Sequence, residues 1–214
     1  MKQLIEETVT FIKDFYQNEY SGHDYDHSLR VYKTAVRLAE KENADLFIVS
    51  MAALLHDVDD RKLSPETADT KANAVNYLRR KNIDVNTIET ICRIIDEVSF
   101  AGTDSVIPGT VEGKCVQDAD RLDALGAIGI ARAFAYGGNH HRKMYDPEEP
   151  PMRNMNREEY RNHVSHTVNH FYEKLFLLKD MMNTETGKKI AEQREAFMRD
   201  FLAEFYREWD GNDR

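Results

Sequence analysis

Apolar residues recur at intervals of three and four along most of the chain, the spacing of amphipathic helices. This pattern predicts helices over about residues 2–19 and 25–42, and Ser21 or Asp24 is a plausible N-cap for the second. After a break at residues 43–45, the stretch that ends at Leu55 is apolar on nearly every side. We expect that third helix to lie at the centre of the fold.

The second half of the chain continues the helical pattern. It predicts short helices over about 70–81 and 85–100, and a long helix over 111–136 in which Gly126 and Gly129 are close packing positions. Residues 137–156 form the longest irregular stretch, which in a compact domain is typical of a functional or disordered loop. Two long helices follow over 157–183 and 184–209, with Thr184 as an N-cap.

The predicted fold is therefore all-α, with no convincing alternating pattern of a strand. We expect a single domain over residues 1–214, a bundle of roughly eight helices. Its core would span about residues 21–137, and a C-terminal helical extension would span about 157–210.

Charge and cysteine content narrow the range of partners. The chain has 29 Lys and Arg against 38 Asp and Glu, and its net charge of −9 disfavours non-specific binding of nucleic acid. Cys92 and Cys115 are the only cysteines, and we found neither a signal peptide nor a membrane-spanning apolar run. We therefore expect free thiols and a cytoplasmic protein without a membrane partner. The aromatic C-terminal end suits either core packing or a homodimer face.

A histidine and an aspartate, His56 and Asp57, stand side by side at the end of the most apolar run. Burying a charged carboxylate there is unfavourable unless a counter-charge accompanies it. A divalent metal ion binds one imidazole nitrogen and one carboxylate oxygen together. His27 lies on the apolar face of its predicted helix, either as a core histidine or as a further ligand, and the presence of His56-Asp57 favours the ligand.

Three aspartates in the predicted helix 111–136 are candidates for a further ligand. A helix turns about 100° per residue, so Asp118 and Asp120 point in nearly opposite directions and at most one can reach a given metal ion. The apolar pattern does not choose between them, and the other would be a surface carboxylate or one behind a ligand. Asp123 shares a face with Asp120, from which it could contact substrate or orient a metal ligand.

The order His27, His56-Asp57 and then Asp120 in an Ala-Asp-Arg-Leu stretch resembles the HD-domain metal-dependent phosphohydrolases. This resemblance implies the metal ligands His27, His56, Asp57 and Asp120. Residues 171–175 and 182–209 are similar to the bacterial branch that includes hydrolases of nucleoside triphosphates. The resemblance thus implies hydrolysis of a nucleoside or deoxynucleoside triphosphate to the monophosphate and pyrophosphate.

The lack of histidines between Asp57 and Asp120 indicates the number of metal ions. Two-metal members of this superfamily have two histidines between the positions of Asp57 and Asp120, whereas this chain has none. We therefore expect one ion, with Mn²⁺ the usual choice in the family and Mg²⁺, Ni²⁺, Co²⁺ or Fe²⁺ also suited to the ligands. Oxygenase chemistry is disfavoured for the same reason.

Hydrolysis needs a proton acceptor and cations for the phosphates. Resemblance to the alarmone-hydrolysing relatives indicates Asp60, three residues after Asp57, as the catalytic base, with Asp59 as its rival. Arg30, one helical turn after His27, is the first candidate to bind phosphate. The further cationic candidates are Arg121, together with His140 and Arg142 of the positive stretch 140–143, which could close over the substrate as a lid.

Two other functions use the same ligands. A 5′-nucleotidase or another phosphomonoesterase would present a different phosphate to the metal ion. A regulatory protein could hold the ion without turnover, because metal ligands can also stabilise a fold.

Overall fold

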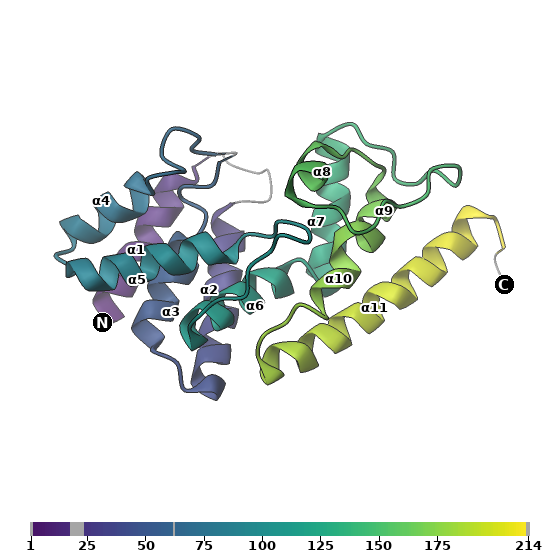
Figure 1. Ribbon diagram of the computed structural model, residues 1–214. Coiled ribbons are helices and arrows are strands. Elements are labelled where there is room, and N and C mark those ends of the chain that lie inside the picture. The colour runs from purple at the N-terminus through teal and green to yellow at the C-terminus, as the bar shows by residue number, and fades with distance from the viewer. Residues whose placement is uncertain (1, 18–23, 62, 213–214) are drawn as a thin grey trace.

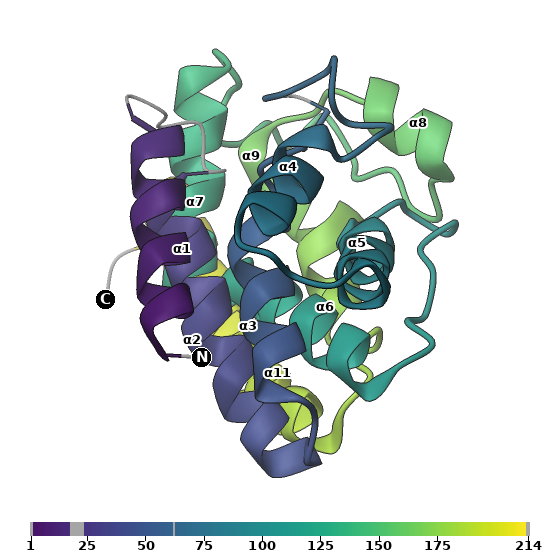
Figure 2. The ribbon, with the colours of Figure 1, turned by 90° about the vertical axis from the view of Figure 1, so that its left-hand side faces the viewer.

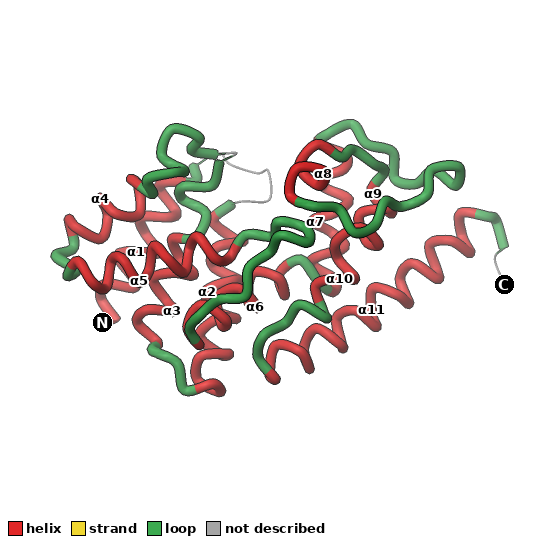
Figure 3. The backbone as a smooth tube through the Cα atoms, viewed as in Figure 1, coloured by secondary structure: helices red, strands yellow, loops and turns green. Residues whose placement is uncertain are grey.

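The structure is a computed structural model that describes residues 2–17, 24–61 and 63–212, and within these ranges it contains helices and no strand. Figure 3 shows this helical architecture, which confirms the all-α prediction. The described residues form more helical segments than the eight expected. These are α1 (Lys2–Phe15), α2 (Tyr25–Glu42), α3 (Leu46–Leu55), α4 (Ala72–Arg80), α5 (Val85–Val98), α6 (Val111–Asp123), α7 (Gly126–Asn139), α8 (Arg157–Asn162), α9 (Thr167–His170), the π-helix η1 (Phe171–Leu175), α10 (Phe176–Leu178) and α11 (Glu185–Trp209).

Helix α3 lies at the centre, as its apolar sequence predicted. Every residue from Val49 to Leu55 is buried, and α3 packs against α1, α2, α5 and α6. Asp24 caps α2, since its side chain accepts a hydrogen bond from the backbone N–H of His27 at 2.7 Å. The alternative cap, Ser21, lies outside the described residues. Helices α2, α3 and α6 thus form a packed group in which the end of α3 lies beside the start of α2 (Figure 2).

The prediction of one long helix over 111–136 is wrong, because the chain turns sharply between α6 and α7. Gly126 takes a φ of 73°, a left-handed conformation that glycine adopts without strain. A Cβ on Gly129 would lie 2.2 Å from the carbonyl oxygen of Ala124, so this glycine lets α7 pack directly on the turn. The turn brings the first part of α7 back over the end of α6.

The prediction of one helix over 157–183 is also wrong. The chain leaves helical conformation at residues 163–166, and the backbone N–H groups of Thr167 and Val168 donate to the carbonyls of Lys143 and Met144. The buried carboxylate of Glu173 accepts hydrogen bonds from His163, Ser165 and the backbone of Met152. Together these hydrogen bonds replace those of a continuous helix. The irregular stretch that takes part in them begins at His140 in the structure.

Helix α11 closes the bundle on the side away from α1. It is the longest helix in Figure 1, packs against α7, α6 and α2, and is capped by Thr184 as predicted. No helix in the described part of the chain is long and apolar enough to cross a membrane.

Candidate metal centre

Four side chains from three helices meet where α2, α3 and α6 come together. His27 lies in the first turn of α2, His56 and Asp57 directly follow α3, and Asp120 lies near the end of α6. The Nε2 atom of His27 is 3.2 Å from Nε2 of His56, 3.4 Å from a carboxylate oxygen of Asp57 and 3.3 Å from one of Asp120. The Nε2 atom of His56 is 3.3 Å from Asp57 and 3.7 Å from Asp120. The structure thus brings together all four predicted ligands.

Hydrogen bonds from behind fix the orientation of both imidazoles. The Nδ1 atom of His27 lies 2.8 Å from a carboxylate oxygen of Asp123, and Nδ1 of His56 lies 2.9 Å from the carbonyl oxygen of Ala53. When each Nδ1 carries the proton and donates it to its oxygen, each Nε2 presents its lone pair to the shared point. Metal-binding histidines are held in this way in proteins.

The donor set fits one divalent ion. Two ligands adjacent to each other around an ion with bonds of about 2.1 Å are roughly 3.0–3.4 Å apart, depending on geometry. Most of the separations between donor atoms given above fall close to this range. His27, His56 and Asp57 also form a group in which every ligand atom lies within 4.8 Å of the others. Two imidazoles and two carboxylates together suit a first-row divalent metal or Mg²⁺.

The charges at the centre show why a cation belongs there. His27 is 1% exposed and His56 and Asp57 are each 7% exposed. Burial alone would lower the pKa of His27, but the surrounding carboxylates of Asp120, Asp123 and Asp57 raise it well above 6.5. Burial likewise lowers the pKa of His56 and the negative charge of Asp57 raises it. The net result is again a raised pKa. In the metal-free centre, protons thus provide positive charge that a metal ion provides when bound.

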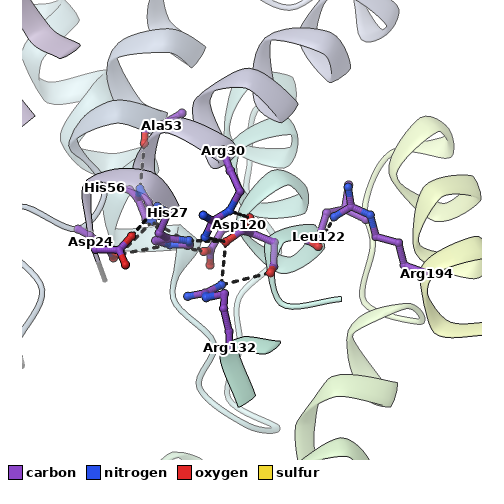
Figure 4. A network of polar contacts seen from close by, with 11 residues as sticks. Asp24, His27, Arg30, Ala53, His56, Asp120, Leu122, Arg132 and Arg194 are labelled. Carbon is purple, nitrogen blue, oxygen red and sulfur yellow. Dashed lines mark hydrogen bonds and ion pairs between the residues drawn. The ribbon is translucent and has the colours of Figure 1, made fainter. Parts of the chain in front are cut away.

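Asp123 orients the centre from behind and is itself held by two arginines. Arg30 donates to both of its carboxylate oxygens, at 2.7 and 3.0 Å, and Arg132 donates to one of them at 2.9 Å. Burial raises the pKa of Asp123, but His27 and the two arginines outweigh it and lower the pKa strongly. Figure 4 shows Arg30 and Arg132 approaching this network from opposite sides. The geometry therefore favours orientation of His27 among the roles that the sequence allowed for Asp123, while its contact with substrate stays a prediction.

This arrangement changes the interpretation of Arg30. Its guanidinium is engaged by Asp123, so its observed part is to hold that carboxylate, and its contact with a phosphate stays a prediction. Arg132 was missed from the sequence, because a continuous helix over 111–136 hides the turn that returns α7 to Asp123. Its sequence position gave no other sign of this contact.

The structure decides between Asp118 and Asp120. Asp118 is completely buried, and its two oxygens accept four hydrogen bonds at 2.7–2.8 Å from the backbone and side chains of Asn183 and Thr184. Gly187 is needed beside it, since a Cβ there would lie 2.5 Å from an oxygen of Asp118. The expectation of a surface carboxylate, or one behind a ligand, is wrong for Asp118, which joins α6 to the start of α11.

The two rivals for the catalytic base have different surroundings. Asp59 is 6% exposed and accepts hydrogen bonds from the backbone N–H groups of Asn73 and Ala74, at 3.1 and 3.0 Å, so it caps the start of α4. Asp60 is partly exposed, and its backbone N–H donates to the carbonyl of the ligand Asp57. The geometry therefore removes Asp59 as an alternative, while the role of Asp60 stays a prediction.

The remaining cationic candidates differ in their exposure to solvent and in their contacts. Arg121 is 4% exposed and donates to the backbone carbonyl of Met181, so it supports the connection to α11. His140 stacks on the ring of Tyr136 at 3.8 Å, and the Arg142 guanidinium lies 5.2 Å from the centre of the same ring. Tyr136 follows Arg132 by one turn of α7, so His140 and Arg142 lie beyond Tyr136, past the end of that helix. Their closure over a substrate stays a prediction.

Comparison with known proteins places this arrangement in context. Residues 24–125 match the model of the HD domain. The chain is 38% identical to the uncharacterized protein YpgQ of Bacillus subtilis over 100% of its own length and 98% of that protein.

Solved structures agree over the whole chain. A crystal structure from Lactobacillus plantarum has 39% identity and a TM-score of 0.88, covering 99% of this chain and 98% of the other. An HD-superfamily hydrolase from Bacillus thuringiensis has 42% identity and a TM-score of 0.77, covering 98% of each chain. YpgQ in complex with ADP has 34% identity and a TM-score of 0.74, covering 98% of this chain and 100% of that one.

Proposed function

The chain belongs to the HD-domain superfamily, whose structural neighbours include HD-superfamily hydrolases, and from this premise we propose that it is a single-metal hydrolase of nucleoside triphosphates. The observation that carries the proposal is the convergence of His27, His56, Asp57 and Asp120 on one point. The complex of the related YpgQ with ADP supports a nucleotide as the ligand class. The products would be the monophosphate and pyrophosphate.

The chain's own residues divide the work. Asp123, held by Arg30 and Arg132, keeps the His27 imidazole in one orientation, and the carbonyl of Ala53 does the same for His56. A bound divalent ion, with Mn²⁺ our first choice, would polarise a phosphoryl oxygen and lower the pKa of the attacking water. Asp60, adjacent to the ligand segment, would accept the proton from that water.

Isotope labelling tests this reaction directly. The Mn²⁺-loaded protein is incubated with a panel of nucleoside and deoxynucleoside mono- and triphosphates in H₂¹⁸O, and the products are separated and weighed by mass spectrometry. From the triphosphates we expect pyrophosphate without orthophosphate, and attack at the α-phosphorus would put the ¹⁸O in the monophosphate. Orthophosphate released from the monophosphates would instead support the phosphomonoesterase alternative. Metal-loaded protein that turns over no phosphoester would leave the non-catalytic alternative.

The proton acceptor is tested with a matched pair of variants. Asp60→Asn should reduce kcat by roughly 100-fold or more, the usual contribution of a general base, with metal content unchanged. Asp59→Asn should leave kcat close to wild type and lower stability, because Asp59 caps α4. Equal activity of Asp60→Asn and wild type would exclude Asp60 as the base.

A further inference from the structure

Lys174 carries a positive charge that the protein does not neutralise. It lies in η1, and among residues 2–17, 24–61 and 63–212 no carboxylate is within ion-pair distance of its Nζ. The neighbouring carboxylate of Glu173 is already occupied by His163, Ser165 and Met152. The side chain of Lys174 is partly buried, and burial lowers its pKa. An ammonium group in such surroundings is unfavourable unless an anion joins it.

Two aromatic rings hold the ammonium group in place. Its Nζ lies 5.0 Å from the centre of the Phe100 ring and 5.8 Å from that of Tyr160, and these two rings pack edge to face. Cation–π contacts attract the ammonium but leave its charge intact. The same rings border a cavity of about 160 Å³, so there is open space beside them.

The metal centre is close enough for its charges to act on Lys174. The negative charge of Asp120 raises the pKa of Lys174, while the positive charges of Arg132 and Arg121 lower it. Asp120 is a predicted metal ligand, Arg132 donates to Asp123, and Arg121 follows Asp120 in the sequence. Lys174 therefore lies within electrostatic reach of the candidate centre, although it belongs to the C-terminal half of the chain, which supplies none of the four predicted ligands.

Metal binding would leave the positive charge of Lys174 with less compensation from the centre. A divalent ion would balance the two ligand carboxylates of Asp57 and Asp120, so that Asp120 would no longer offset the charge of Lys174. The bound ion and the ammonium group of Lys174 would then both attract a polyanion, although the whole chain has a charge of −9.

We propose that Lys174, whose ammonium group lies over the rings of Phe100 and Tyr160, binds the phosphate chain of the substrate beside the metal centre. This inference rests on the proposed function for the identity of the substrate, but the binding itself needs no turnover. The π-helical turn is consistent with such a role, because π-helical turns recur at functional sites. An ammonium ion provides a point charge that binds phosphate oxygens in several geometries.

Equilibrium binding tests the proposal. Inorganic tripolyphosphate is titrated into Mn²⁺-loaded wild-type protein and the Lys174→Met, Lys174→Arg and Lys188→Met variants by calorimetry. Lys188 is a matched control, since it is an exposed lysine that pairs with Glu185 on α11. We expect Lys174→Met to weaken tripolyphosphate binding by about tenfold to 100-fold, Lys174→Arg to restore part of it, and Lys188→Met to match wild type.

Two further readouts separate this role from a structural one. Metal content should be the same in all four proteins, and the melting temperature of Lys174→Met should equal or exceed that of wild type, because an unpaired charge has been removed. Equal tripolyphosphate affinity in wild type and Lys174→Met, or no binding by wild type, would overturn the proposal. Lysine-dependent binding without any turnover would support this inference and refute the proposed function.

Discussion

Helix α6 carries two carboxylates, two residues apart, whose surroundings differ completely. The oxygens of Asp118 accept four hydrogen bonds from Asn183 and Thr184 at the start of α11. On nearly the opposite side of the helix, Asp120 faces the Nε2 atoms of His27 and His56. The first carboxylate is fully satisfied by protein donors, whereas the second lies among atoms that themselves need a cation.

The difference shows that burial alone does not identify a functional carboxylate. Asp118 is completely buried, while the side chain of Asp120 is 26% exposed. The informative quantity is what fills the lone pairs of the oxygens. Donor N–H and O–H groups complete a structural site, and converging imidazole nitrogens and carboxylates leave room for an ion.

The largest expected effect is the loss of metal from Asp120→Asn. This variant removes a ligand, so metal affinity should fall by more than the roughly 100-fold associated with residues that only orient a ligand. Metal content by plasma mass spectrometry and affinity by calorimetry measure this. Asp200→Asn on the exposed face of α11 is the control and should bind metal as wild type does. Full metal content in Asp120→Asn would break the contrast between the two carboxylates.

The converse substitution, Asp118→Asn, should affect stability and leave metal affinity unchanged. An amide NH₂ would face donor groups of Thr184 that now bond to a carboxylate oxygen. We expect the free energy of unfolding to fall by about 3 kcal/mol, measured by chemical denaturation of the metal-loaded protein. A weakened metal site in a fully stable Asp118→Asn protein would show that this carboxylate serves the centre.

Asp123 lies between the two extremes, because it touches a ligand without being one. Asp123→Asn should lower metal affinity by about 10-fold to 100-fold, since the neutral amide oxygen of asparagine would hold the His27 imidazole more weakly than the carboxylate does. Calorimetric titration with Mn²⁺ measures the change. If Asp123→Asn lost metal as completely as Asp120→Asn, Asp123 would have to be counted as a ligand.

The smallest of these effects is the dependence of metal affinity on pH. The raised pKa of His27 means that metal binding displaces a proton, so affinity should rise with pH, by roughly tenfold per pH unit while one proton is displaced. Mn²⁺ titrations between about pH 6 and 8 test this. Asp123→Asn removes one cause of the raised pKa, so its rise in affinity should level off at a lower pH. Affinity that does not change with pH would contradict the protonated metal-free centre.

The metal-free protein should show the opposite trend in stability. A raised pKa of His27 in the folded state stabilises the fold fully below the unfolded value of about 6.5. This contribution is lost as pH rises through the folded pKa of His27. Bound metal should remove that loss, because it stabilises the folded protein more as its affinity rises.

Local signals in the sequence were sufficient for the parts of the molecule that depend on local chemistry. The apolar run before His56 predicted a central helix, and Asp24 and Thr184 were identified as caps because capping uses nearby donors. The positions of His27, His56 and Asp57 could be interpreted because a buried charge next to an imidazole is rare. Asp120 was assigned only through family resemblance, since helical periodicity favoured neither aspartate.

Contacts between distant segments were not predictable in the same way. The apolar spacing continues through residues 124–126 and 163–166, but the glycine turn and the hydrogen bonds to the irregular stretch override it. As a result, the sequence did not reveal the contact of Arg132 with Asp123 or the position of Lys174 over the rings of Phe100 and Tyr160. The cap that Asp59 provides to α4 spans fourteen residues and was equally hidden.

The hydrogen bonds between Asp118 and Thr184 also bear on how far the chain can be shortened. The segment that matches the HD domain, residues 24–125, contains all four predicted ligands but ends well before Asn183 and Thr184. Cut out on its own, that segment would expose α6 and leave Asp118 without its donors. We therefore expect residues 24–125 alone to be less stable than a chain that extends into α11.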